Sequence, residues 1–241
     1  MDCMQFSLII PAFNEAGNIE NLVRECFSVL PDSMLGEVIV VDDCSNDKSL
    51  EQLSALKPEF KNLRILSHLT NAGQSAALRT GIMAASYPVI AQLDGDGQND
   101  PSDLPSLLER LGDPGFDGVA LVGGIRTNRK DTGSKRWASK AANKIRDFVL
   151  QDDCPDTGCG TKVYWREAFL NLPFFTSIHR YLPALFQTYG YQCEYVPVND
   201  RPRLSGVSKY NNLGRAMVGL YDLIGVRWLR RRTKFPGAKE L

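Results

Sequence analysis

The chain has 241 residues, of which 43% are hydrophobic, enough for one large domain with a substantial core. Its 28 Lys and Arg residues balance its 28 Asp and Glu residues, so no overall positive charge attracts nucleic acid. The six cysteines form no C-x-x-C pair, and the two histidines, His68 and His179, lie far apart in the sequence. This pattern disfavours a zinc site.

The N-terminus lacks the basic segment and long apolar run of a signal peptide. We therefore expect reduced cysteines and a cytoplasmic protein. No stretch reaches about 18 uninterrupted apolar residues, the usual minimum for a membrane span. The nearest candidate, 213–229, is interrupted by Arg215, Asp222 and Arg227.

Short apolar runs alternate with helical periodicity along the first half of the chain. The predicted strands are 6–10, 37–41, 63–66, 89–93 and 119–122, and Pro11 is expected to end the first of them. The predicted helices begin near residues 15–18, after the turn at 42–47, and at residues 71 and 101. This alternation predicts an α/β fold with a doubly wound, mostly parallel sheet flanked by helices.

The second half of the chain is less regular. Helices are predicted at 134–150 and 176–189, the latter with a break at Pro183. A turn at 156–161 enters a strand, and Pro197 makes 195–198 a candidate edge strand. We expect a catalytic domain at 1–210 and a helical arm at 211–241.

Polar segments follow several of the predicted strands, at the edge where doubly wound sheets bind ligands. The most informative is Asp94-Gly95-Asp96-Gly97-Gln98, which comes directly after an apolar run. Two carboxylates two residues apart can share one hard cation, and oxygen ligands suit Mg²⁺ or Mn²⁺. Taken alone, the same motif is also compatible with an acidic turn that caps the strand.

Four motifs occur in a fixed order: Pro11-Ala12-Phe13-Asn14-Glu15, Val40-Val41-Asp42-Asp43-Cys44-Ser45, Asn71-Ala72-Gly73 and Asp94-Gly95-Asp96-Gly97-Gln98. This series resembles the inverting family 2 glycosyltransferases with a GT-A fold. Within them it is most similar to the dolichol-phosphate-mannose synthase and polyprenyl-phosphate glycosyltransferase branch. The segments 156–159 and 203–209 resemble the same branch, so the likeness runs from about Phe6 to Tyr210.

The resemblance implies roles for individual residues. The nucleotide and donor would be bound by Pro11, Phe13, Glu15, Val41, Asp43, Asp94, Gly95 and Arg126. Asp94, Asp96 and Gln98 would hold Mg²⁺ or Mn²⁺, and the catalytic residues would be Asp96, Asp156, Arg203 and Lys209. The residue types leave alternatives open: Glu15 and Asp43 are also suited to helix capping, and the cations to solvated loops.

The expected reaction is a single inverting displacement that moves a sugar from a GDP- or UDP-sugar to a polyprenyl phosphate. The oxygens of such a phosphate are largely ionised at neutral pH, so no strong base is needed. Asp156 would then orient the acceptor or simply hold the turn before Gly158. The alternatives are a soluble family 2 transferase acting on a glycan hydroxyl and a nucleotide-sugar-binding module without turnover. A dehydrogenase is disfavoured because no G-x-G-x-x-G follows the first strand.

The C-terminal arm combines apolar and basic residues. Leu213, Met217, Leu220, Ile224 and Leu229 fall broadly on one side of a helix with Tyr221 and Trp228, followed by Arg227, Arg230, Arg231, Arg232 and Lys234. This pattern suits an anionic membrane surface and predicts a peripheral protein at the cytoplasmic membrane. An ordinary helix packed on the core, or one docked on an integral membrane partner, remains an alternative.

Overall fold

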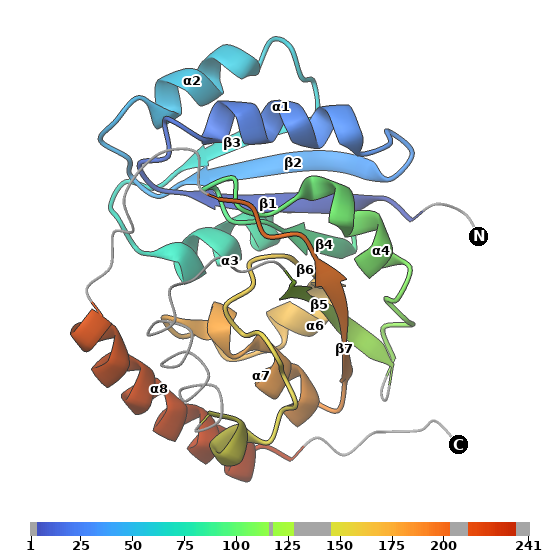
Figure 1. The fold of residues 1–241 in the computed structure, drawn as a ribbon, viewed down its shortest axis with the longest axis vertical. Coiled ribbons are helices and arrows are strands. Elements are labelled where there is room, and N and C mark those ends of the chain that lie inside the picture. Colours follow the sequence, from blue (N-terminus) through green and yellow to red (C-terminus); the bar gives the residue numbers. More distant parts are fainter. Residues whose placement is uncertain (1–3, 116–117, 128–145, 203–211, 235–241) are drawn as a thin grey trace.

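The computed structural model describes residues 4–115, 118–127, 146–202 and 212–234. Within them, one sheet has the strand order β3-β2-β1-β4-β6-β5-β7 (Figure 1). The strands are β1 (Phe6–Ala12), β2 (Leu35–Asp42), β3 (Leu63–Ser67), β4 (Val89–Gln92), β5 (Val119–Arg126), β6 (Lys162–Trp165) and β7 (Gln192–Val198). All run in one direction except β6, which is antiparallel to both of its neighbours.

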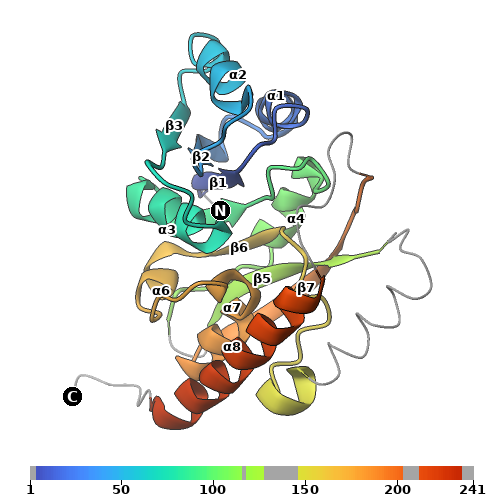
Figure 2. The ribbon, with the colours of Figure 1, turned by 90° about the vertical axis from the view of Figure 1, so that its left-hand side faces the viewer.

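Helices cover both faces of this sheet. They are α1 (Ile19–Val29), α2 (Ser49–Leu56), α3 (Gln74–Ala84), α4 (Leu104–Leu108), α6 (Arg166–Leu170), α7 (Leu182–Thr188) and α8 (Asn212–Arg232), with short 3₁₀ turns η1 (Pro101–Asp103) and η2 (Ile178–Arg180). Figure 2 shows α1 on one face of β1 and β2 and α3 on the opposite face. Because β1 and β2 are covered on both sides, every residue of these strands is buried, which explains their continuous apolar character.

The first strand continues past the point where the sequence predicts its end. Pro11 lies inside β1 and pairs with Val41 of β2. The pairing of β1 with β4 ends at Ile9 and Gln92, so no strand lies opposite the position where Pro11 lacks an N–H. Pro11 therefore costs the sheet no ladder hydrogen bond, and the strand reaches Ala12.

The second half of the chain confirms two predictions, modifies a third and tests a fourth over a few residues. The helix predicted at 176–189 is divided into η2 and α7, with Pro183 in the first turn of α7. β7 is an edge strand, and the turn at 156–161 leads into β6. Of the helix predicted at 134–150, only 146–150 lies within the described residues, and it is helical.

Helix α8 packs against the fold with one face and is exposed on the other. Leu223 and Val226 are buried, and Tyr181 donates a hydrogen bond to the carbonyl of Gly219 (3.1 Å). Among the described residues, no helix combines the length and apolar character that crossing a bilayer requires. The outward face of α8 carries Leu220, Tyr221, Ile224 and Trp228.

Candidate active site

The loops that follow β1 and β2 form one continuous wall at the carboxyl edge of the sheet. The backbone N–H of Asn14 donates to Ser45 Oγ (2.9 Å), and the N–H of Asn46 donates to Asn14 Oδ1 (2.8 Å). The N–H of Glu15 donates to Ser49 Oγ (2.8 Å). Asn14 and Cys44 have φ angles of 53° and 62°, a conformation that residues with a side chain adopt at an energetic cost. Hydrogen bonds from backbone N–H groups to side-chain oxygens therefore fix the conformation of this wall.

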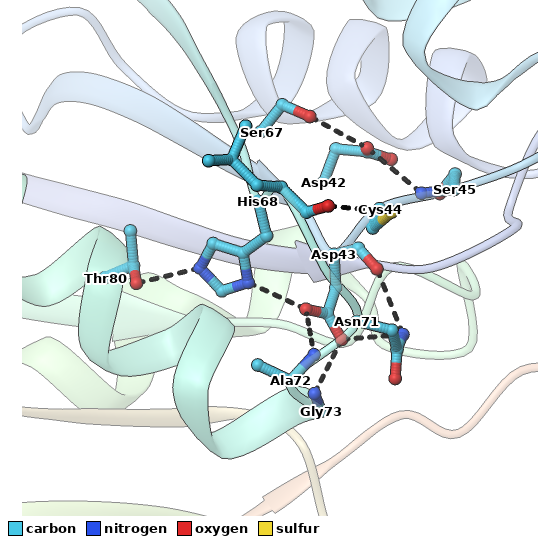
Figure 3. Close-up of polar contacts among 11 residues, drawn as sticks. Asp42, Asp43, Cys44, Ser45, Ser67, His68, Asn71, Ala72, Gly73 and Thr80 are labelled. Atoms are coloured by element: carbon cyan, nitrogen blue, oxygen red, sulfur yellow. Dashed lines mark hydrogen bonds and ion pairs between the residues drawn. The ribbon is translucent and has the colours of Figure 1, made fainter.

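Asp43 anchors a third loop to this wall (Figure 3). Its Oδ1 accepts from the N–H of Ala72 (2.9 Å) and lies 2.7 Å from Nδ1 of His68. Its Oδ2 accepts from the N–H of Gly73 (2.7 Å) and from Asn71 Nδ2 (2.9 Å). A carboxylate offers about four acceptor positions, and here the protein fills four of them. Only 3% of Asp43 is exposed.

His68 connects Asp43 to helix α3. Because an ionised carboxylate only accepts, Nδ1 of His68 carries the proton that faces Asp43. Its other ring nitrogen, Nε2, lies 2.9 Å from Thr80 Oγ1, in the second turn of α3 (Figure 3). The preceding residue, Ser67, donates to Oδ2 of the buried Asp42 (3.3 Å). Both aspartates at the end of β2 are therefore held by residues from the end of β3 and from the β3–α3 connection.

Asp94 and Asp96 follow β4 and have a different environment. Burial raises the pKa of Asp94 to about 6, and the negative charge of Asp96 contributes to the rise. Three groups oppose this rise: the positive charges of Lys162 and Arg126 and a hydrogen bond from Gln74. They do not return the pKa of Asp94 to the usual value of an aspartate. Two carboxylates that repel one another at a strand end form a site at which a divalent cation would relieve the repulsion.

The position of Asp94 is fixed from two directions. Gln74 Nε2 donates to Asp94 Oδ1 (2.8 Å), and the backbone N–H of Asp94 donates to Asn99 Oδ1 (3.0 Å). On the other side, a Cβ placed at Gly160 would lie only 2.4 Å from Asp94 Oδ2. Gly160 is therefore required for the turn before β6 to approach Asp94 this closely.

The available ligands fit a hard cation that also binds the substrate. Among the described residues, no three His, Cys, Asp or Glu side chains form a metal-binding group, so a cation would depend on two carboxylates, an amide and substrate oxygens. Gln98 supplies the amide: its Nε2 donates to the carbonyl of Arg201 (3.2 Å), which leaves its oxygen for another partner. This oxygen-only set suits Mg²⁺ or Mn²⁺, which bind carboxylates and phosphates together.

Arg126 and Asp156, predicted separately, form a bidentate ion pair. Arg126 Nε and Nη2 each lie 2.7 Å from an oxygen of Asp156, which is buried. Burial disfavours the charged guanidinium, but the hydrogen bonds to Asp156 and the negative charge of Asp156 together outweigh that effect and raise the pKa of Arg126. Of the two roles considered for Asp156, this pairing favours the one that holds the turn before Gly158.

The remaining predicted residues differ in accessibility. Phe13 and Glu15 are partly exposed in the wall formed by the β1 and β2 loops. Val41 is fully buried, and its side chain faces Gly81 of α3; Pro11 and Gly95 are also buried. These three can contribute to nucleotide binding only through their backbone or by supporting the wall. Arg203 and Lys209 lie outside the described residues.

A family model described as glycosyl transferase family 2 matches residues 7–172. The chain belongs to this family. It is 32% identical to the dodecaprenyl-phosphate galacturonate synthase of Rhizobium johnstonii over 97% of this chain and 70% of that protein. It is 30% identical to an undecaprenyl-phosphate 4-deoxy-4-formamido-L-arabinose transferase of Enterobacter over 90% of this chain and 66% of that protein. The chain thus spans about two thirds of the length of these relatives. As a member of this family, it is itself a glycosyltransferase.

Solved structures confirm the GT-A fold. Glucosyl-3-phosphoglycerate synthase from Mycobacterium tuberculosis, in complex with Mg²⁺ and UDP, has a TM-score of 0.69 at 19% identity, covering 98% of this chain and 81% of that one. A complex of the same enzyme with Mn²⁺, UDP and glucosyl-3-phosphoglycerate has a TM-score of 0.66 at 18% identity and covers 98% of this chain and 82% of that one. At this level of identity the likeness concerns the fold alone.

None of the sequence motifs marked Gln74, His68 or Lys162 as site residues. Lys162 is only 4% exposed at the start of β6, and its Nζ donates to the carbonyl of Cys159. A lysine directly before the apolar run Val163-Tyr164-Trp165 is a signal that could have identified it, because buried lysines usually have a charged or polar partner. No comparable signal marks Gln74 or His68, whose partners lie 20 and 25 residues away in the sequence.

Proposed function

We propose that this glycosyltransferase uses Mg²⁺ or Mn²⁺ to move a sugar from a UDP- or GDP-sugar to a polyprenyl phosphate, at the cytoplasmic surface of a membrane. The observation that carries the metal-dependent part is the placement of Asp94 and Asp96 together after β4, where burial and the negative charge of Asp96 raise the pKa of Asp94 to about 6. A divalent cation bound there would neutralise the diphosphate as the sugar leaves it. Asp94, Asp96 and the amide oxygen of Gln98 would hold the cation.

The wall formed by the β1 and β2 loops is proposed to bind the nucleoside. Phe13 and Glu15 are partly exposed there and offer a ring for the base and a carboxylate for ribose hydroxyls. Asp43 would act mainly by fixing residues 71–73, because four hydrogen bonds from the protein fill its acceptor positions. Arg126 would contribute positive charge near the diphosphate while paired with Asp156.

The polyprenyl phosphate acceptor is proposed from the relatives, whose names specify dodecaprenyl and undecaprenyl phosphate. Such a phosphate is already ionised and needs no dedicated base, which agrees with an Asp156 held in an ion pair. To test this, the protein is incubated with Mn²⁺, labelled UDP- and GDP-sugars and polyprenyl phosphate. Label in the organic phase supports the proposal. Label only on an added glycan supports a soluble transferase, and nucleotide binding without transfer supports a binding module.

The exposed face of α8 is proposed to contact the membrane. Tyr221 is 80% and Trp228 63% exposed, with Leu220 and Ile224 on the same outward face and Arg231 and Arg232 exposed at the end of the helix. Apolar and aromatic side chains next to cations suit an anionic lipid surface. This outward stripe differs from the one predicted from sequence, because Leu229 packs against the core, while Leu213 and Met217 lie outside the described side chains.

Vesicle binding tests this role of α8. Replacing Arg231 and Arg232 with Gln should weaken binding to phosphatidylglycerol vesicles by roughly 30-fold, because each surface cation contributes about 1 kcal/mol. The matched control replaces Lys57 and Lys61 with Gln. Both are exposed near α2, at the opposite end of the molecule from α8 (Figure 1). Equal losses in the two variants would indicate nonspecific charge attraction and reject α8 as the membrane contact.

A further inference from the structure

Five consecutive residues connect the two acidic segments of the site. Asn71, Ala72 and Gly73 donate hydrogen bonds to Asp43, and the next residue, Gln74, donates to Asp94. Ser75 then pairs with Nδ1 of His179 in η2 (2.7 Å). Residues 71–75, which lead into α3, therefore contact the nucleotide wall, the proposed metal ligand and η2 in direct succession.

Within this segment, Gln74 is the residue that reaches the proposed metal ligand. The backbone N–H groups of Ala72 and Gly73 are already bound to Asp43, so they are not directed at Asp94. Gln74 is the first residue of α3, and its side-chain amide lies 2.8 Å from Asp94 Oδ1. Because Gln74 belongs to α3, the helix fixes the position of its Cα atom.

The contact also helps to fix the orientation of the Asp94 carboxylate. Gln74 holds Oδ1, while Gly160 packs so closely to Oδ2 that a Cβ there would lie at 2.4 Å. The carboxylate is thereby kept in one orientation between α3 and the turn before β6. Carboxylates that ligate metals are commonly oriented by such hydrogen bonds, and loss of one typically costs about 10- to 100-fold in metal affinity.

We infer that Gln74 is a positioning residue that orients Asp94 to bind the divalent cation. The inference rests on the proposed function, because it requires a metal at Asp94 and Asp96. Gln74 itself does not touch the metal, the donor or the acceptor. It acts through the orientation of one carboxylate, so excess metal should compensate for its loss.

The test replaces Gln74 with Met, which matches its length but donates no hydrogen bond. Mn²⁺ affinity is measured with UDP or GDP present, because the diphosphate supplies part of the cation's ligands. The free-ion signal in electron paramagnetic resonance reports it, with the nucleotide alone as the blank. We expect Gln74→Met to bind Mn²⁺ about 10-fold more weakly. We also expect its transfer rate to return toward the unchanged value at saturating Mn²⁺, which a general structural defect would not allow.

The matched control is Ser75→Ala, which removes a hydrogen bond of similar length from the neighbouring residue but none from Asp94. This variant should keep the original Mn²⁺ affinity, and thermal unfolding of both variants checks that each is folded. A second variant, Gln74→Ala, repeats the measurement if Met disturbs packing. Equal Mn²⁺ affinity for the unchanged protein and the folded Gln74 variants would overturn the inference alone. No Mn²⁺ binding by the unchanged protein beyond that of the nucleotide alone would overturn the proposed metal site as well.

Discussion

Two strand-end carboxylates, Asp43 after β2 and Asp94 after β4, have opposite kinds of surroundings. At the end of β2, Asp43 receives four hydrogen bonds from His68 and residues 71–73 and is almost fully buried. At the end of β4, Asp94 receives a hydrogen bond from Gln74 but faces the charge of Asp96, and its pKa rises to about 6. The first arrangement stabilises a carboxylate with protein groups, whereas the second leaves a negative charge that a cation can stabilise.

The partners of a carboxylate indicate whether its role is structural or functional. A carboxylate whose acceptor positions are filled contributes to the fold, and its loss exposes several donors at once. A carboxylate with unfavourable surroundings is kept at a cost to stability, which is typical of functional sites. We therefore expect substitution of Asp43 to lower mainly the stability of the protein, and substitution of Asp96 to lower mainly its activity.

The largest effect is expected at Asp96. Asp96→Asn keeps the shape of the side chain but removes one of the two charges that would hold the cation. Sugar transfer should fall by at least about 100-fold, since loss of an outer-shell group alone costs up to that much. The free energy of unfolding should change by less than about 0.5 kcal/mol. Transfer at a near-normal rate in this variant would contradict the metal assignment.

The next largest effect is expected on stability, at Asp43. In Asp43→Asn, an amide NH₂ group replaces an oxygen and faces donors from the loop at 71–73 or from His68. Leaving such groups without an acceptor should lower the free energy of unfolding by about 3 kcal/mol, measured by urea denaturation. Asp96→Asn, denatured under the same conditions, is the control. If the two variants were equally stable, the distinction between the two strand ends would fail.

The pH dependence of metal binding should further distinguish Asp94 from Asp43. Asp94 must be ionised to bind a cation, and its pKa in the metal-free protein is about 6. Between pH 5 and pH 6, Mn²⁺ affinity should therefore rise about fivefold, and it should level off above pH 7. For folding the sign is the reverse. The raised pKa makes Asp94 contribute stability below its unfolded value near 4, which is lost as the pH rises through about 6.

Isothermal titration of Mn²⁺ at several pH values measures this dependence. Asp94→Asn provides the control, because it should bind Mn²⁺ weakly at every pH. The same variant should be more stable than the unchanged metal-free protein at pH 7.5, since it removes a charge that the fold disfavours. A Mn²⁺ affinity independent of pH between 5 and 7 would show that Asp94 is not the group that must lose a proton.

The sequence was sufficient to place both acidic pairs at strand ends but not to distinguish them. Apolar runs ending in Asp42-Asp43 and Asp94-Gly95-Asp96 predict strands followed by functional turns, and β2 and β4 confirm the strands. The groups that fill Asp43 lie 25 to 30 residues further along the chain, so their convergence depends on the crossover through β3. Likewise, the pairing of Arg126 with Asp156 depends on β6 inserting antiparallel between β4 and β5, which no local pattern specifies.

The smallest predicted effect tests how far the stabilisation of Asp43 extends. Thr80 does not touch Asp43, but its Oγ1 lies 2.9 Å from Nε2 of His68, whose Nδ1 faces the carboxylate. Thr80→Val keeps the shape of the side chain and removes this outer hydrogen bond, so it should cost about 1 kcal/mol in urea denaturation. In the background of Asp43→Asn the same substitution should cost less, because His68 no longer faces a charged acceptor. Equal costs in both backgrounds would show that Thr80 acts on α3 alone, and that the stabilisation of Asp43 ends at His68.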